Sequence, residues 1–555
     1  MAESALLDPI RDALSGAAEA ISGHVPPAVP LASPASPEMG DIATPMAMSM
    51  ARQVRRSPRE IAQAVADHLS ADPAVHEWLA SVEVAGPGFL NMRLTEAWFA
   101  AIATLMAESG PSFGAGSARP ARRVLMEYVS ANPTGPPHVG HARQAAYGDS
   151  LARLLAFAGH TVAREYYVND HGRQMRLFGA SVAARYAQLC GIEAEVPDDG
   201  YRGDYVVDIA ESVRAEVGDA WADRSQPPTD EALAYFSAQG ERLMLDAIRG
   251  DLDRFRVGFD SFFSETTLHE EGRVAAAVQK LEVAGDAYRR DGALWFATSK
   301  YGDEKDRVLV RSDGDSTYLA ADVAYHLDKA GRGDDVLIDV LGADHHGYIA
   351  RLRAVLAAGG YPPEMLEPVI IQLVSLLERG EAKKMSKRAG TVVTLGDLLD
   401  DIGVDAARFF LVQRSHETAL DLDLDLAREQ SQENPVYYVQ YAHARVCSIL
   451  GQLGGDGGVS ASGAPTELDP SERALVLKLA EWPEAVAEAA ERRAPHRVAA
   501  YLIDVARDFH AFYHRCRVVG EQTDVQAFRV DLCRATANTV TVGLGLLGVE
   551  APDRM

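Results

Sequence analysis

The spacing of hydrophobic and polar positions changes twice along this chain of 555 residues, and the changes predict three domains. In the first, residues 1–108, apolar positions at helical spacing occupy 5–21 and 58–69. Two shorter alternating runs within 82–94 flank a Gly-Pro-Gly turn, as in a pair of antiparallel strands. Helices combined with two such strands predict a small α+β domain.

The second region, residues 109–434, alternates short β-type runs with helical ones. The β-type runs include 123–129, 161–168, 336–340 and 369–376. This alternation predicts an α/β fold with a Rossmann-like, parallel, doubly wound sheet, whose ligands bind at the carboxyl ends of the strands. A mostly helical and acidic stretch at about 175–260 interrupts the alternation, and we interpret it as an insertion.

The third region, residues 435–555, has a helical pattern. Its apolar positions follow helical spacing at 436–450, 471–492, 495–518 and 525–547. Several helices with no intervening strand pattern predict an all-α bundle.

The segment 123–159 carries the first candidate chemistry. A β-type run leads into a Pro/Gly-broken loop, and a His-Val-Gly-His motif at 138–141 then opens a helix that ends at Gly159. Such a helix start binds anions through backbone N–H groups and the helix dipole, and Gly140 lets a flat ring approach the backbone. The segment indicates a nucleotide site, although two His at a helix start are more often caps or surface residues, and the motif alone is weak.

Composition narrows the function classes. The chain holds 54 basic and 80 acidic residues, a formal charge of −26, which argues against general, non-specific nucleic-acid binding. Arginine-rich segments such as 52–59 and 492–497 still allow a specific nucleic-acid partner. The four cysteines form neither a CxxC pair nor a zinc pattern, which fits a reducing compartment. Because we find no signal peptide and no apolar run of about 18 residues, we expect a cytoplasmic protein without membrane contact.

A second motif, KMSKR at 384–388, follows the last β-type run. Lysines beside Ser in a loop suit the negative charge that develops on a leaving pyrophosphate. HVGH at a strand–helix junction, followed by KMSK, resembles the HIGH and KMSKS motifs of the class I aminoacyl-tRNA synthetases. In that family the two motifs grip ATP while the carboxylate of the amino acid attacks the α-phosphate. Val139 and Arg388 depart from the family's motifs.

Longer segments resemble one family of that class, the arginyl-tRNA synthetases. They are ANPTGPPHVGHAR at 131–143, YVNDHGRQM at 167–175, GADHHGY at 342–348 and NPVYYVQYAHAR at 434–445. The resemblance implies a ligase that activates L-arginine with ATP to arginyl-adenylate, then transfers arginine to the 3′-terminal ribose of tRNA(Arg), releasing AMP and pyrophosphate. It also implies that residues 1–108 contact tRNA, that 435–555 bind the anticodon, and that arginine activation requires bound tRNA.

The resemblance further implies the site residues. Those for ATP are Gly135, His138, Gly140, His141, His345, Lys384, Met385, Ser386 and Lys387, of which His138, His141, Lys384 and Lys387 are expected to be catalytic. Those for arginine are Glu127, Ser130, Asn132, His141, Tyr318, Asp322 and Asp344. The residue chemistry agrees, because a guanidinium favours carboxylates, and Tyr318 and Asp322 are four positions apart on one expected helix face. Taken alone, Glu127 also fits an edge-strand charge, and Asp322 a helix ion pair.

We expect ATP as a substrate together with Mg²⁺, which arrives with it, and no protein-bound metal, the acidic alternation at 421–425 included. We also expect a monomer. One alternative is a sister class I synthetase for cysteine or glutamate, disfavoured by the missing Cys/His cluster and by the acidic candidate pocket. Another is a non-catalytic tRNA-binding paralogue, which the two intact motifs disfavour.

Overall fold

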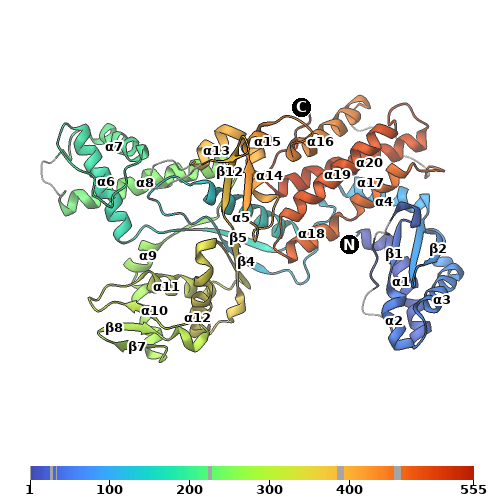
Figure 1. Cartoon of the computed structure of the whole chain (residues 1–555), viewed down its shortest axis with the longest axis horizontal. Coiled ribbons are helices and arrows are strands. Elements are labelled where there is room, and N and C mark those ends of the chain that lie inside the picture. The colour runs from blue at the N-terminus through green and yellow to red at the C-terminus, as the bar shows by residue number, and fades with distance from the viewer. Residues whose placement is uncertain are drawn as a thin grey trace.

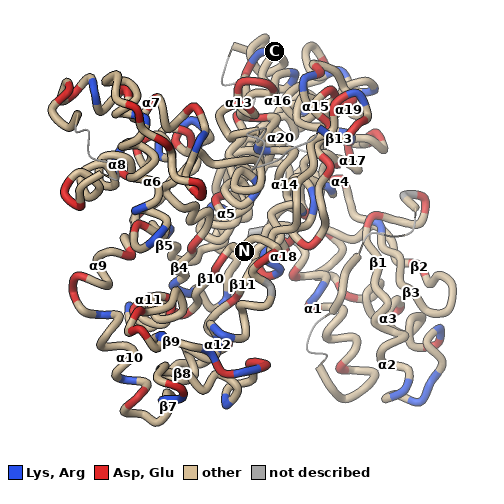
Figure 2. Tube along the Cα trace, turned by 60° about the vertical axis from the view of Figure 1, so that its left-hand side comes forward, with Lys and Arg blue, Asp and Glu red and all other residues tan. Residues whose placement is uncertain are grey.

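The computed structural model of the chain describes residues 2–25, 29–32, 34, 36–222, 228–383, 393–454 and 464–555. A parallel sheet lies near the centre of the molecule, helices α6–α8 and the small sheet containing β7 and β8 extend from it as separate lobes, and the C-terminal helices cover another side (Figure 1). Lys/Arg and Asp/Glu positions are both distributed over all these parts (Figure 2). Among the described helices, none has the length and apolar character that crossing a bilayer requires.

The N-terminal part is α+β, as predicted. Its elements are α1 (Ala2–Ser22), β1 (Ile42–Thr44), α2 (Met46–Val54), α3 (Pro58–Ala71), β2 (Leu79–Ala85), β3 (Phe89–Leu94) and α4 (Glu96–Ser109), with sheet order β1-β3-β2. Helix α3 begins where the sequence indicates, because Ser57 and Glu60 form a capping box and Pro58 occupies the first turn. Gly88 must be glycine, because a Cβ there would lie 2.7 Å from the Pro58 side chain.

The central sheet is parallel throughout, which confirms the predicted α/β class. Its strands are β4 (Arg123–Glu127), β5 (Thr161–Val168), β6 (Ser261–Ser264), β10 (Val336–Gly342) and β11 (Leu366–Ile371), in the order β11-β10-β4-β5-β6. The chain extends the sheet from β4 toward β6 and later returns to the other side of β4 with β10. The strand order therefore reverses between β4 and β10, the position at which open α/β sheets bind ligands.

The prediction of a single strand at 369–376 is wrong. Strand β11 ends at Ile371, and β12 (Val374–Glu378) pairs in another sheet with β13 (Glu381–Ala382) and β14 (Leu420–Asp423). The break has a long-range cause. The N–H of Gln372 donates to the carbonyl of His416 at 2.9 Å, and the Gln372 carbonyl accepts from Arg143 Nη1 at 2.8 Å. Partners this distant in the sequence leave no local pattern.

Helices follow the central strands and fill the insertion. Those against the sheet include α5 (Val139–Phe157), α11 (Tyr318–Gly331) and α12 (Ile349–Gly359). The expected helical insertion contains α6 (Arg173–Leu189), α7 (Asp204–Val217) and α8 (Asp230–Arg254). A second unit, which the sequence pattern did not separate, combines α9 (Glu265–Glu270) and α10 (Arg273–Val283) with the antiparallel sheet of β7 (Ala287–Arg290), β8 (Ala293–Phe296) and β9 (Arg307–Val310).

The C-terminal part is helical, as predicted. Its helices and those leading into it are α13 (Leu395–Ile402), α14 (Val404–Val412), α15 (Leu424–Arg428), α16 (Pro435–Gln452), α17 (Pro470–Ala480), α18 (Trp482–Glu491), α19 (His496–Arg515) and α20 (Thr523–Leu546). The one helix expected at 471–492 is two, because Pro483 lies in the first turn of α18 and has no N–H with which to continue α17.

A fully buried ion pair joins α5 to α14, and its arginine also bonds to the end of α20. Arg408 of α14 and Asp149 of α5 both have fully buried side chains, with 2.5 Å between Nη2 and Oδ2. The same guanidinium donates to the carbonyl of Leu547 at 2.6 Å and to that of Phe255 at 2.9 Å. Gly548 leaves room for it, because a Cβ there would lie 2.1 Å from Arg408 Nε. Three segments distant in the sequence therefore meet at one side chain.

Replacing Asp149→Ala should lower the free energy of unfolding by about 3–5 kcal/mol, because it leaves the buried guanidinium without its carboxylate. Urea unfolding followed by circular dichroism measures this loss. The control is Asp400→Ala, which removes an ion pair with Arg254 whose side chains are 72% and 45% exposed, and it should cost about 0–1 kcal/mol. Equal losses in the two variants would show that burial does not set the cost.

Candidate functional site

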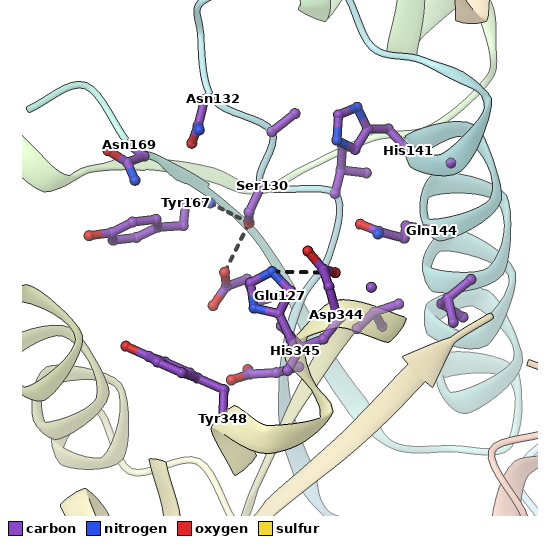
Figure 3. A pocket seen from close by; sticks show the side chains of 18 of the residues that line it. Glu127, Ser130, Asn132, His141, Gln144, Tyr167, Asn169, Asp344, His345 and Tyr348 are labelled. Atoms are coloured by element: carbon purple, nitrogen blue, oxygen red, sulfur yellow. Dashed lines mark hydrogen bonds and ion pairs between the residues drawn. The ribbon is translucent and has the colours of Figure 1, made fainter. Parts of the chain in front are cut away.

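A cavity of about 940 Å³ opens at the carboxyl ends of β4, β5 and β10, between the start of α5 and helix α11 (Figure 3). Ten of the residues expected in the site line it: Glu127, Ser130, Asn132, His138, Gly140, His141, Tyr318, Asp322, Asp344 and His345. The structure thus brings together side chains that are up to 218 positions apart (345 − 127). The cavity lies where the strand order reverses.

The two motif histidines do cap helix α5, as the structural alternative expected. The N–H of Gly140 donates to His138 Nδ1 at 3.1 Å, and the N–H of His138 donates to His141 Nδ1 at 3.3 Å. Because each Nδ1 accepts, each neutral ring carries its proton on Nε2, which makes Nε2 a donor suited to an anion. The flat ring beside Gly140 is that of His138 itself, since a Cβ at Gly140 would lie 2.9 Å from His138 Cε1.

The loop after β4 has an unusual backbone. Val129 and Ser130 have φ values of 70° and 41°, in the left-handed region that residues other than glycine rarely adopt. Such conformations cost about 1–3 kcal/mol each and persist only where contacts enforce them. Here Ser130 Oγ donates to Glu127 Oε1 at 2.9 Å and accepts the N–H of Tyr167 at 3.1 Å (Figure 3). These bonds hold the loop against β5 and fix the wall of the cavity.

A buried cation lies beneath the cavity. The Lys329 side chain is fully buried, and its Nζ donates to Glu127 Oε2 at 2.8 Å and to Asp339 Oδ1 at 2.6 Å. Burial lowers the pKa of Lys329, but the charges of Asp339 and Glu127 outweigh it and hold that pKa above its usual value. Glu127 is not an edge-strand charge, because β4 lies between β10 and β5.

Asp322, in contrast to Glu127, is not paired with a described Lys or Arg. It lies one turn after Tyr318 on α11, and its carboxylate accepts a hydrogen bond from the Tyr348 hydroxyl. Within the described part of the chain no Lys or Arg forms an ion pair with Asp322, so the alternative of a helix ion pair does not hold there. Burial raises the pKa of Asp322, because desolvation disfavours the carboxylate. A cationic ligand would remove that penalty.

The cavity is acidic as a whole. Its lining carboxylates are Glu127, Glu265, Asp322, Asp339 and Asp344, while no described Lys or Arg lines it. Burial raises the pKa of Glu265 to about 7, with the charges of Asp322 and Asp170 adding to the shift. Excess negative charge in a concave, partly desolvated site attracts cations, so the arrangement favours a positively charged ligand.

Several lining residues were missed from the sequence, and most had a usable signal. They include Gln144, Tyr167, Asn169, Glu265, His326, Asp339 and Tyr348. Tyr167 and Asp339 lie near the carboxyl ends of β5 and β10, and Glu265 follows β6, where a parallel sheet binds ligands. Lys329, beneath the cavity, is seven positions after Asp322 and therefore shares its helix face.

Gly135 does not line the cavity. It lies beside Tyr205, whose hydroxyl donates to the Thr134 carbonyl at 2.8 Å. The expected ATP residues Lys384, Met385, Ser386 and Lys387, together with Arg388, lie outside the described residues. The described chain resumes at Val393, next to the start of α5, where the N–H of Val139 donates to the Val393 carbonyl at 3.3 Å.

Three protein-family models match the chain. The model of the arginyl-tRNA synthetase N-terminal domain matches residues 5–94, and that of the class I (R) tRNA synthetase catalytic domain matches 113–427. The model of the DALR anticodon-binding domain matches 439–555. The catalytic model alone covers more than half of the chain.

Individual proteins agree with these models. The chain is 46% identical to arginine–tRNA ligase of Shouchella clausii over 534 residues, 95% of each chain, and 44% identical to that of Bacillus subtilis over 532 residues, also 95% of each. The solved structure of Thermus thermophilus arginyl-tRNA synthetase is similar at a TM-score of 0.75 and 26% identity, over 99% of this chain and all of that one. With this similarity along its full length, the chain belongs to the arginyl-tRNA synthetase family.

Proposed function

We propose that this protein joins L-arginine to tRNA(Arg) in two steps. ATP first converts arginine to arginyl-adenylate with release of pyrophosphate, and the arginyl group then passes to the 3′-terminal ribose with release of AMP. The observation that carries the proposal is that the two ends of one cavity differ in chemistry. One end is acidic around Asp322, and the other has the His138 and His141 donors at the start of α5. A cationic amino acid and a polyphosphate suit these two ends.

At the acidic end, Asp322 binds the arginine guanidinium, with Tyr318 on the same helix face and Tyr348 orienting the carboxylate. Glu127 has one oxygen on Ser130 and the other on Lys329, so its main role is to hold these groups in place. Ser130 and Asn132 orient the α-amino and carboxylate groups, and Asp344 also lines the cavity. A site that pairs a guanidinium with buried acceptors discriminates strongly against amino acids without one.

At the ATP end, His138 and His141 donate to phosphate oxygens, aided by the N-terminus of α5, by Gly140 and by His345. Mg²⁺ enters with ATP and supplies positive charge at the phosphates. Lys384 and Lys387 stabilise the pyrophosphate as it leaves, and Met385, Ser386 and Gly135 complete the expected ATP contacts. Catalysis then consists of positioning an arginine carboxylate oxygen against the α-phosphorus and stabilising the charge that develops.

The tRNA contacts are assigned to the two ends of the chain, residues 1–108 and 435–555, which flank a catalytic domain at 109–434. In the C-terminal helices, the rings of Tyr437 and Tyr441 stack, and the guanidinium of Arg445 lies 4.4 Å from the Tyr441 ring and 4.5 Å from that of Tyr513. Aromatic and guanidinium planes of this kind stack with unpaired bases. We expect the protein to act as a cytoplasmic monomer.

Incubation of the purified protein with ATP, Mg²⁺, radiolabelled arginine and tRNA(Arg) should give arginyl-tRNA. Lys387→Ala should reduce the rate by roughly 10²-fold or more, because one cation at the leaving pyrophosphate is lost, while tRNA binding remains. Charging with cysteine or glutamate instead would favour a sister synthetase. Tight tRNA binding by the unmodified protein without any charging would favour a non-catalytic paralogue.

ATP–pyrophosphate exchange driven by arginine should require tRNA(Arg). The expectation comes from the family, in which bound tRNA precedes arginine activation. The measurement compares exchange of labelled pyrophosphate with tRNA(Arg), with a tRNA for another amino acid, and without tRNA. Strong exchange in the last sample would disprove the requirement in this protein.

Asp322→Asn should raise the KM for arginine and lower kcat/KM by roughly 10²–10³-fold, because the guanidinium loses a charged acceptor. The KM for ATP should stay near that of the unmodified enzyme, since ATP is assigned to the other end of the cavity. The matched control is Asp328→Asn, on the same helix but paired with Arg332 and Arg273 away from the cavity. If both variants lost activity equally, Asp322 would not be the guanidinium ligand.

A further inference from the structure

Two histidines and a glutamate meet at the rim of the cavity. The side chains of His171, Glu265 and His269 each bring one ligand atom into a group whose members all lie within 4.8 Å of one another. Glu265 also lines the cavity, whereas neither histidine does. The group is therefore next to the site described above but distinct from its arginine and ATP contacts.

Asp170 holds the two contributing segments together. His171 follows β5, and Glu265 and His269 lie one turn apart on α9. Asp170 Oδ1 accepts the N–H of Thr266 at 2.8 Å, and its Oδ2 accepts a hydrogen bond from the Ser264 hydroxyl. The loop after β5 is thereby fixed against the start of α9, which keeps the three side chains next to one another.

The local chemistry is that of a metal ligand set. The rings of His171 and His269 stack, with centroids 3.8 Å apart and planes 14° apart. The Nε2 of His269 is buried, has no hydrogen-bond partner, and lies 3.5 Å from Glu265 Oε1. The carboxylate of Asp170 adds negative charge beside the group.

We propose that His171, Glu265 and His269 form a binding site for a divalent transition metal of the Zn²⁺ type, and that occupancy of this site weakens arginine binding. Two imidazoles and a carboxylate, with water in the fourth position, are a common Zn²⁺ ligand set. Zn–N and Zn–O bonds of about 2.0–2.2 Å require the ligand atoms to move closer together. The exposed His171 can do so by a rotamer change.

The effect on arginine follows from Glu265. A dication coordinated there adds two positive charges beside the acidic cavity, so the attraction for a guanidinium falls. This second half of the proposal rests on the proposed function, whereas metal binding itself does not. No local pattern indicates the group, because His171 and His269 are 98 positions apart (269 − 171) and Glu265 follows another strand, β6.

A second group of this type among the described residues, His443, Cys447 and Asp553, is a weaker candidate. Both nitrogens of His443 are already engaged, Nδ1 with the Pro552 carbonyl at 3.0 Å and Nε2 with Thr541 Oγ1 at 3.0 Å. A metal there would have to displace a hydrogen bond that holds the end of the chain.

The test uses full-length protein without a histidine tag. Zn²⁺ affinity is measured by competition with a chromophoric chelator, and Co²⁺ addition is followed by visible absorption for the bands of a four- or five-coordinate site. The unmodified protein should bind one equivalent, and the double variant H171N/H269N should bind at least about 100-fold more weakly, since loss of outer-shell partners alone costs up to that factor. The variant H68N, which alters an exposed His of α3, should bind like the unmodified protein.

Arginine affinity is then measured by calorimetry with and without saturating Zn²⁺. Zn²⁺ should raise the arginine Kd several-fold in the unmodified protein and leave it unchanged in H171N/H269N, whose melting temperature without metal should match. Equal Zn²⁺ affinity in both proteins would overturn the site, and an unchanged arginine Kd at full Zn²⁺ occupancy would overturn the coupling. The chelator arm contains neither arginine nor ATP, so failure of the proposed function cannot imitate either result.

Discussion

The site depends on one buried ammonium group. Glu127 and Asp339 are register partners on the adjacent parallel strands β4 and β10, so the fold brings two carboxylates side by side at the point where the strand order reverses. Two like charges in such surroundings are unstable without a counter-charge. Lys329 lies between them and bonds to both. Because Lys329 belongs to α11, the same contact fixes the helix that carries Tyr318 and Asp322 into the cavity.

The carboxylates of the site therefore fall into two groups, those paired with a cation of the protein and those that are not. The carboxylates of Glu127 and Asp339 are compensated by Lys329, whereas that of Asp322 accepts from the Tyr348 hydroxyl and has a raised pKa, because burial outweighs the nearby His326 and His345. The compensated pair gives the floor its rigidity, and the uncompensated group provides the attraction for a cation. A wholly compensated cavity would bind a guanidinium weakly, and a wholly uncompensated one would shift its pKa values until it became neutral.

Sequence patterns predicted what depends on near neighbours in the chain. Strand β5 was predicted at its observed limits, and the Ser57 cap and the start of α5 follow local rules. The motifs then indicated the family, and ten expected residues line one cavity. The pairing of Lys329 with Glu127, 202 positions away, and the break at Gln372 depend on contacts that only the folded chain creates. The place of Gly135 outside the cavity lining has the same origin, since Tyr205 of the insertion lies against it.

Helix α5 contacts both the cavity and the C-terminal part of the chain. Its first turn presents His138 and His141 to the cavity. In its middle, Asp149 pairs with Arg408, whose guanidinium donates to the Leu547 carbonyl at the end of α20. The Tyr147 hydroxyl adds a hydrogen bond to the Arg493 carbonyl at 3.0 Å, in the turn between α18 and α19. A buried ion pair of this kind does not stretch gradually, because separating its charges in a desolvated site is costly. The position of His138 and His141 is therefore tied to the packing of the C-terminal helices on α5 through Tyr147 and Asp149 of the same helix.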